Sequence, residues 1–183
     1  MDELEFQVTL YPDPVLRKVA EPVEAFDEDL RRTVEGMLAR MRASKGVGLA
    51  APQVGLRRRI LVLNPTGEPE DDLVLVNVQI LERFGPESPF DEGCLSFPEI
   101  YAEVVRPESC RIRAQRVDGT AVELEFDGFT SRIVQHEYDH LEGVLLVDRM
   151  SPADKARNRA ALEALVEAYR AKNPRARVGG RRR

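Results

Sequence analysis

Cysteine and histidine are scarce in this chain of 183 residues, which contains two of each. Two cysteines are too few for the disulfide framework of a small secreted protein, so we expect a reducing compartment. No uninterrupted apolar run reaches the length of a membrane span. The first residues, Met1–Glu5, are acidic where a signal peptide would be basic and then apolar. These absences argue against a disulfide scaffold and a membrane protein, and we expect a cytoplasmic protein.

The charge balance separates the body of the chain from its end. With 43% hydrophobic and 32% charged residues, the chain can build a hydrophobic core, and its length fits one domain. Its net charge is −5, which does not favour a DNA-binding protein. Residues 172–183 contain six basic residues and no acidic one, so residues 1–171 carry −11. We therefore expect one catalytic domain over residues 1–171 and a disordered basic tail over 172–183.

The spacing of hydrophobic residues predicts three helices. They are expected over residues 25–44, 129–142 and 151–170. Asp27 and Ser151 are suitable N-caps, because their short side chains can accept a hydrogen bond from the first turn. Gly46 and Gly143 follow the first two helices, where glycine commonly ends a helix.

The predicted strands lie mainly between the first two helices. They are expected over residues 60–63, 73–81, 101–106, 110–116 and 121–126, with a further short strand over 144–147. Asp118 and Gly119 separate two of them and are typical of a hairpin turn. This order predicts an α+β fold, with antiparallel and mixed β-sheets around a central helix, an N-terminal helix and a C-terminal helix.

The clearest chemical signal is the pair His136 and His140, which are the only two histidines of the chain. Residues four apart share one face of a helix, so both imidazoles can reach one metal ion. Glu137 follows the first histidine and can take a proton from a water on that metal. The pattern predicts a hydrolytic metal site on the central helix.

A hydrolytic metal site normally has three protein ligands and one open position. Cys94 lies between a glycine and a serine at a predicted turn, which favours it as the third ligand. Cys110 lies in an alternating apolar strand and is expected to be a core residue. Glu163, 23 residues beyond His140, is the rival ligand, although a solvated position on the last helix is the simpler interpretation.

A third segment, residues 46–53, is rich in glycine and alanine. Small residues allow another backbone to approach closely, so an extended peptide could pair with this strand edge. Gln53 at its end would then offer an amide donor near the metal.

Three segments, 46–53, 92–96 and 135–143, resemble the three signature motifs of the peptide deformylase family and occur in the family's order. Residues 11–17 also resemble the family's N-terminal segment, and the similarity spans about residues 6–150. The resemblance implies hydrolysis of the formyl group from the N-terminal formyl-methionine of new polypeptides, with release of formate.

The resemblance also implies roles for single residues. Cys94, His136 and His140 would bind the metal, and Glu137 would be the general acid and base. Gln53 and the backbone amide of Leu95 would stabilise the oxyanion. The backbone at Gly46 and Gly48 would hold the substrate in an extended pose. Gln135 would belong to the supporting residues.

An apolar pocket for the first substrate side chain is expected near the metal. Phe129, Ile133 and Tyr101 are the residues that could line it. Arg132 lies one helical turn before His136, where an apolar residue would be expected. We expect Arg132 either to point to solvent or to narrow the mouth of the pocket.

The resemblance implies iron(II) as the metal in the cell. The same Cys-His-His donor set also suits zinc, nickel or cobalt in purified protein. The expected partners are formyl-methionyl nascent chains and, through the C-terminal helix and basic tail, the ribosome.

Two alternatives remain at this point. One is a zinc endopeptidase with Glu163 as the third ligand. The other is a metal-stabilised module that binds nascent chains without turnover, which would require a site closed by four ligands.

Overall fold

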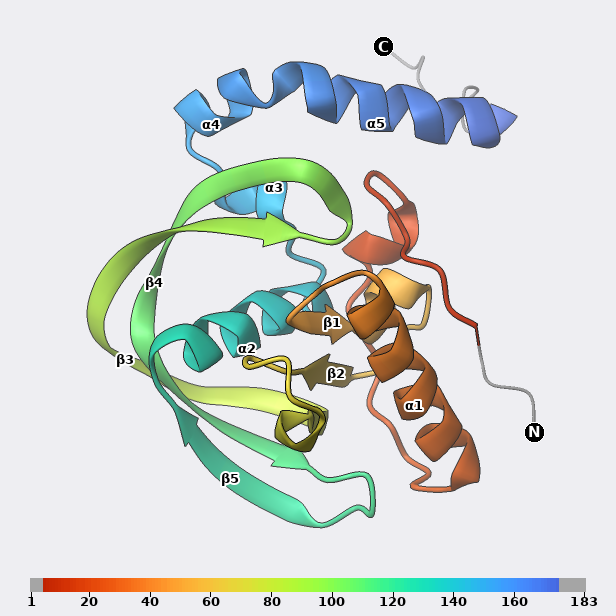
Figure 1. Ribbon diagram of the computed structural model, residues 1–183, viewed down its shortest axis with the longest axis vertical. Helices are drawn as coiled ribbons and strands as arrows, with labels where there is room; N and C mark the ends of the chain where they lie inside the picture. The colour runs from red at the N-terminus through yellow and green to blue at the C-terminus, as the bar shows by residue number, and fades with distance from the viewer. Residues whose placement is uncertain (1–4, 175–183) are drawn as a thin grey trace.

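The computed structural model describes residues 5–174, which form one five-stranded sheet and five α-helices (Figure 1). The strands follow the order of the chain, and every neighbouring pair is antiparallel. They are β1 (Gly48–Ala50), β2 (Ile60–Leu63), β3 (Leu73–Cys94), β4 (Phe97–Gln115) and β5 (Ala121–Phe126). The antiparallel prediction is confirmed. Within residues 5–174, parallel pairing is limited to one isolated bridge between Glu21 and Arg58.

Strands β3 and β4 are longer than predicted. The predicted strand over 73–81 continues to Cys94, and the two strands predicted over 101–106 and 110–116 are one strand. Pro107 pairs with Glu87 next to a shift in register. A proline is tolerated at such an irregularity, because the ladder there does not need its missing N–H.

The helices are α1 (Glu28–Ala43), α2 (Gly128–Leu141), α3 (Leu146–Arg149), α4 (Pro152–Arg157) and α5 (Arg159–Lys172). Short 3₁₀ turns lie at Pro14–Arg17, Ala51–Val54 and Pro69–Asp71. Asp27 caps α1 by accepting a hydrogen bond from the Leu30 amide at 3.1 Å, as predicted. No helix within residues 5–174 combines the length and hydrophobicity that a membrane crossing needs.

Two predictions near the C-terminus are wrong. The strand predicted over 144–147 is absent, because Leu145 donates its amide to the Asp148 side chain at 2.8 Å and starts the helical turn α3. The helix predicted over 151–170 is divided at Asn158 into α4 and α5. Ser151 caps α4 as predicted. The basic tail beyond residue 174 lies outside the described residues.

The short strands β1 and β2 are enclosed between two helices. On one face, Ala50 and Leu61 pack in a cluster with Ile133 and Val134 of α2. On the other face, Ile60 and Val62 pack in a cluster with side chains of α1. Both faces of these strands are therefore buried, which explains why residues 60–63 are continuously apolar. Cys110 is fully buried in the first cluster, as predicted.

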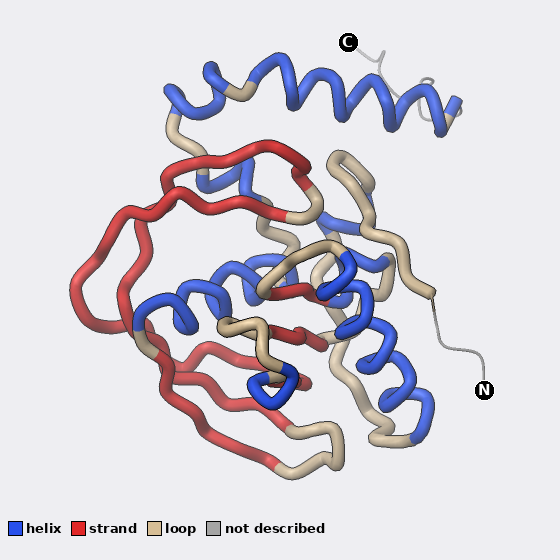
Figure 2. Tube along the Cα trace, viewed as in Figure 1, coloured by secondary structure: helices blue, strands red, loops and turns tan. Residues whose placement is uncertain are grey.

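Helix α2 runs through the concavity formed by the long, curved strands β3 and β4 (Figures 1 and 2). Helix α5 lies on the outside and has no buried residue, although Leu162 and Leu165 pack against a third cluster. The curved sheet thus surrounds the helix that carries His136, Glu137 and His140.

Candidate metal centre and active site

Cys94, His136 and His140 converge at the centre of the curved sheet. One ligand atom from each of the three lies within 4.8 Å of the other two. The two histidines are one turn apart on α2, and their ring centres are 5.3 Å apart. Cys94, at the end of β3, places its Sγ 3.3 Å from His140 Nε2. The fold therefore brings the favoured third ligand from a distant segment to the two histidines.

The rival ligand Glu163 lies elsewhere. It is on the outer helix α5, where its side chain is 66% exposed and faces Arg159 at 3.7 Å. It does not belong to the group formed by Cys94, His136 and His140. The geometry therefore favours the cysteine over the glutamate.

The two histidines differ in their protonation. Burial and the neighbouring His136 hold the pKa of His140 well below its ordinary value, so its imidazole is neutral. Burial lowers the pKa of His136, but hydrogen bonds with Cys94 and Glu92 outweigh it and raise this pKa well above the ordinary value. Binding of a metal at His136 would therefore release a proton.

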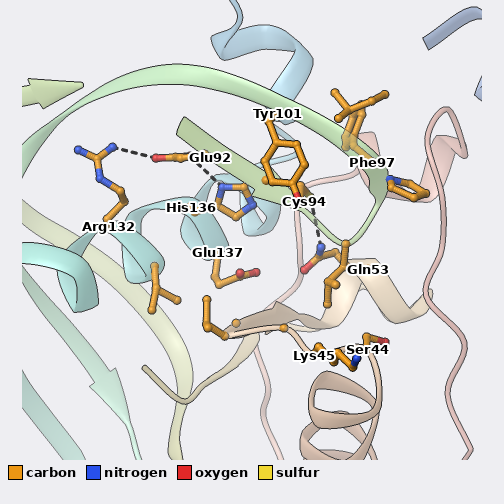
Figure 3. Close-up of a pocket in the computed structure, with 18 of the residues that line it drawn as sticks. Ser44, Lys45, Gln53, Glu92, Cys94, Phe97, Tyr101, Arg132, His136 and Glu137 are labelled. Carbon is orange, nitrogen blue, oxygen red and sulfur yellow. Dashed lines mark hydrogen bonds and ion pairs between the residues drawn. The ribbon is translucent and has the colours of Figure 1, made fainter. Parts of the chain in front are cut away.

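Glu137 points toward the same space (Figure 3). It is 4% exposed, and its Oε2 has no hydrogen-bond partner within residues 5–174. Burial raises the pKa of Glu137 to about 7. A buried carboxyl group with no partner is costly, so its presence here indicates a ligand, water or substrate that completes its contacts. A carboxyl group with a pKa near neutrality suits the exchange of a proton during catalysis.

Gln53 approaches the group of three from the 3₁₀ turn after β1. Its Oε1 accepts a hydrogen bond from the Ala50 amide at 2.8 Å, which fixes the side-chain amide. Its Nε2 then faces Cys94 Sγ at 3.6 Å and Ser96 Oγ at 3.4 Å. Neither the thiol sulfur nor the distant hydroxyl is a strong acceptor, so the fixed Nε2 donor is available to a stronger one.

Strand β1 and the residues just before it approach the carboxyl group of Glu137 and the side chain of Leu95. An added Cβ on Gly48 would be 2.5 Å from Glu137 Oε1, and one on Gly46 would be 2.7 Å from Leu95 Cδ1. The added Cβ on Gly48 would also lie 2.8 Å from Ile133 Cγ2, so a glycine at position 48 lets the strand approach α2 this closely. Among the described strands, β1 pairs with β2 alone, so its second edge faces no other strand of the sheet. This agrees with the predicted edge for an extended peptide.

A pocket of about 520 Å³ opens in front of these groups. Its wall includes every predicted site residue except His140. Ile133 is buried, whereas Phe129 and Tyr101 are 46% and 55% exposed and lie at the rim. Sequence reasoning missed Phe90, Phe97 and Ile100, which also line the pocket. All three lie outside segments 46–53, 92–96 and 135–143, and only the curvature of β3 and β4 brings them to the pocket.

Arg132 does not point to solvent, contrary to one of the two expectations. Its side chain is 9% exposed and lies in the pocket wall. Gln135 supports the helix from the other side, because it donates to the Pro107 carbonyl of β4 at 2.9 Å.

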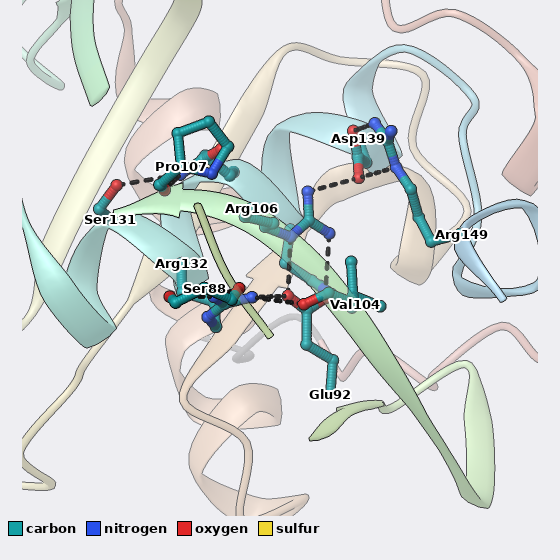
Figure 4. Close-up of polar contacts among 11 residues, drawn as sticks. Ser88, Glu92, Val104, Arg106, Pro107, Ser131, Arg132, Asp139 and Arg149 are labelled. Atoms are coloured by element: carbon teal, nitrogen blue, oxygen red, sulfur yellow. Dashed lines mark hydrogen bonds and ion pairs between the residues drawn. The ribbon is translucent and has the colours of Figure 1, made fainter. Parts of the chain in front are cut away.

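Glu92 is the centre of a buried ionic network (Figure 4). Its Oε2 lies 3.0 Å from His136 Nδ1. Arg106 donates to both of its oxygens, at 2.7 and 3.0 Å, and Arg132 donates to Oε1 at 3.0 Å. Burial would raise the pKa of Glu92, but the hydrogen bonds from His136 and Arg106 lower it to about 2. Glu92 is therefore ionised and orients the His136 ring so that its other nitrogen faces the site.

Asp139 extends the network toward α3. It accepts from Arg106 at 2.9 Å and from Arg149 at 2.6 Å. Sequence reasoning did not identify these supporting roles. Glu92 and Asp139 stand inside two of the recognised segments, but Arg106 has no local signal.

The residues present fit a divalent metal. The thiolate of Cys94 and two imidazoles form a donor set typical of zinc, iron, nickel or cobalt. His140 Nδ1 and Glu137 Oε2 are buried polar atoms without partners within residues 5–174, and both belong to this site.

Comparison with known proteins identifies the family. Residues 6–156 match the polypeptide deformylase family. Peptide deformylase 1B of Arabidopsis thaliana is 46% identical over 93% of this chain, which spans 63% of that protein. The peptide deformylase of Thermotoga neapolitana is 44% identical over 90% of the chain and 99% of its own length.

Solved structures agree with the sequence comparison. A crystal structure of a plant peptide deformylase superposes with a TM-score of 0.90 at 45% identity, covering 95% of this chain and 96% of the other. The peptide deformylase of Plasmodium falciparum gives a TM-score of 0.89 at 39% identity, covering 91% and 99%. The chain therefore belongs to the polypeptide deformylase family, whose members are hydrolases that remove N-terminal formyl groups.

Proposed function

We propose that this chain hydrolyses the formyl group of N-terminal formyl-methionine in newly made polypeptides and releases formate. The observation that carries the proposal is the position of Glu137. Its buried carboxyl group, without a partner within residues 5–174, lies beside the Cys-His-His group and against the backbone of strand β1. A proton-transfer group, a metal-binding set and a peptide-binding edge thus meet in one pocket.

Cys94, His136 and His140 would hold a divalent metal ion. When bound, the ion supplies Lewis-acid chemistry and lowers the pKa of water at the site. Glu137 accepts a proton from the water that attacks the formyl carbon. The same carboxyl group then donates this proton to the leaving amine, so that formate and a free N-terminus are the products.

The oxyanion that forms in the transition state needs hydrogen-bond donors. Gln53 Nε2 and the backbone amide of Leu95 are proposed for this role. Gln53 is held by its bond to the Ala50 amide, so little reorganisation is needed when charge develops. Leu95 adjoins Cys94, which places its amide close to the metal-binding group.

The substrate is proposed to lie along the open edge of β1. An extended chain would bond to the backbone at Gly46 and Gly48, as an added strand does. Its first side chain would enter the pocket between Ile133 and the rim residues Phe129 and Tyr101.

Iron(II) is the proposed metal in the cell. A Cys-His-His set does not select one metal by affinity alone, so the ion that is loaded depends on supply. The thiolate of Cys94 would make an iron enzyme sensitive to air, because it can be oxidised. Protein purified without oxygen should contain iron and lose activity in air, whereas nickel- or zinc-loaded protein should keep its activity longer.

The ribosome is the proposed partner, and the cytoplasm the proposed location, because the substrate is a nascent chain. The catalytic domain is proposed to span residues 1–171.

The ribosome contact would be made by helix α5, which has no buried residue, and by the basic residues 172–183. Deletion of residues 172–183 should weaken ribosome binding and its dependence on salt, while hydrolysis of free formyl-peptides stays constant. Equal binding by both proteins across a salt titration would contradict the proposal.

The decisive experiment is anaerobic reaction of the iron-loaded protein with formyl-Met-Ala-Ser. We expect equal amounts of formate and Met-Ala-Ser. Cleavage at an internal peptide bond would support an endopeptidase, and binding without formate release would support a binding module. Metal analysis of Cys94→Ala and Glu163→Ala separates the two ligand sets, since only the cysteine change should remove the metal.

A further inference from the structure

Arg132 is a charged residue in the wall of the pocket that is proposed to bind the apolar first side chain of the substrate. It shares one face of α2 with three other wall residues, Phe129, Ile133 and His136, at the spacing of successive helical turns. Arg132 is thus between the rim of the pocket and a proposed metal ligand. Its position assigns it to the part of the pocket proposed for the first substrate side chain.

The guanidinium of Arg132 is fixed from several sides. Nη1 donates to Glu92 Oε1 and to the Val104 carbonyl, both at 3.0 Å. Nη2 donates to the carbonyl and the hydroxyl of Ser88, at 2.8 and 3.2 Å. The Cζ atom of Arg132 also lies 5.2 Å from the ring centre of Phe90. Figures 3 and 4 show this side chain directed toward Glu92 and Ser88.

These contacts make the wall at Arg132 stiff. An apolar side chain at this position could change rotamer to admit a longer substrate group. Arg132 could do so only by breaking bonds to β3 and β4 and by leaving the buried carboxylate of Glu92 with less compensating charge. The four N–H groups on its terminal nitrogens are already used, so Arg132 acts on the substrate by shape.

We propose that Arg132 determines substrate specificity by limiting the length of the first side chain to that of methionine. This inference rests on the proposed function. One added methylene in a fitted pocket typically changes kcat/KM by about 10- to 200-fold. The S-ethyl homologue of methionine (ethionine) is longer by one methylene. We therefore expect kcat/KM of the unmodified enzyme to be at least about tenfold lower for formyl-ethionyl-Ala-Ser than for formyl-Met-Ala-Ser.

The test compares the ratio of the two kcat/KM values in three proteins. Arg132→Met keeps an unbranched apolar stem and removes the guanidinium, so it opens space at the wall. Arg106→Met is the matched control, because Arg106 also binds Glu92 but is not part of the pocket wall. The ratio is the correct readout, since loss of metal or of folded enzyme lowers both values equally.

In Arg132→Met we expect the kcat/KM values for the two peptides to differ by no more than about threefold, because the methylene then has room. In Arg106→Met we expect the same ratio of the two values as in the unmodified enzyme. An unchanged ratio in Arg132→Met would overturn the inference. An equal change in both variants would also overturn it, because Arg132 would then act only through Glu92. Should Arg132→Met not fold, equal use of both substrates by the unmodified enzyme would still refute a length limit. Hydrolysis of neither peptide by the unmodified enzyme would instead refute the proposed function.

Discussion

Replacement of Glu92 by glutamine tests whether the buried ionic network stabilises the fold. Glutamine has almost the same shape and keeps one acceptor oxygen, but it removes the negative charge. Arg106 and Arg132, with side chains 5% and 9% exposed, would then face a neutral group in a buried environment. Removing one partner of a buried ion pair typically costs about 3–5 kcal/mol of stability, because the other charge is left without compensation.

The pKa of Glu92 gives a second estimate. It falls from an ordinary value of 4.5 to about 2 in the folded protein. At about 1.4 kcal/mol for each pKa unit, this difference corresponds to about 3 kcal/mol in favour of the folded state. The pKa is lowered on folding, so this stability is present above pH 4.5 and is lost as the pH falls toward 2. The two estimates agree.

Urea unfolding at pH 7 measures the effect. The two proteins should be compared after chelation, so that a difference in metal content does not contribute. We expect the midpoint of Glu92→Gln to be lower by about 1–3 M urea, or the melting temperature by about 6–12 °C. The difference should be constant between pH 7 and 5 and should shrink below pH 4.5. The reasoning would be refuted if Glu92→Gln lowered the free energy of unfolding at pH 7 by less than about 1 kcal/mol. It would also be refuted if the difference in stability between the two proteins did not depend on pH.

Three further changes test the site. Glu137→Ala should keep the metal but lower kcat by about 10²–10⁴-fold, because it removes the proton-transfer group and no ligand; a rate near that of the unmodified enzyme in the formate assay would make Glu137 structural. Gly48→Ala should place a methyl group against Glu137 and Ile133. It should reduce kcat by about 100-fold and stability by about 1–3 kcal/mol, measured by initial rates and urea unfolding with metal content unchanged. Gln53→Ala should lower kcat by about 100-fold or more with a smaller change in KM; a raised KM with constant kcat would assign Gln53 to substrate binding.

The parts of the site that are local in the chain could be predicted from the sequence. His136, Glu137 and His140 share one helix, so helical spacing alone places them together. The caps at Asp27 and Ser151 were predictable for the same reason, since each depends on a hydrogen bond within three residues. Residues 60–63 were recognisable as a strand because their burial on both faces leaves a continuous apolar run.

Features that depend on distant contacts were not predictable in this way. The spacing of residues leaves Cys94 and Glu163 open as the third ligand, and only the turn after β3 brings Cys94 to His140. Residues 144–147 look like a strand because they are apolar. They begin a helical turn because the Asp148 side chain accepts the amide of Leu145. Arg106 carries no sequence signal at all, because its role depends on Glu92 and Asp139 meeting it from other elements.

The two histidines of one helix are held by different means, and this difference follows from the curved sheet. His136 faces β3, where Glu92 orients its ring and two arginines fix that carboxylate. His140 is buried, its Nε2 lies 3.3 Å from Cys94 Sγ, and its Nδ1 has no hydrogen-bond partner within residues 5–174. The same burial that keeps His140 neutral raises the pKa of Glu137 to about 7. Enclosing α2 in strands β3 and β4 thus has two consequences: it keeps one metal ligand neutral, and it gives Glu137 a carboxyl group that can exchange protons near neutral pH. The ionic network lies on one side of the helix, where paired charges compensate one another.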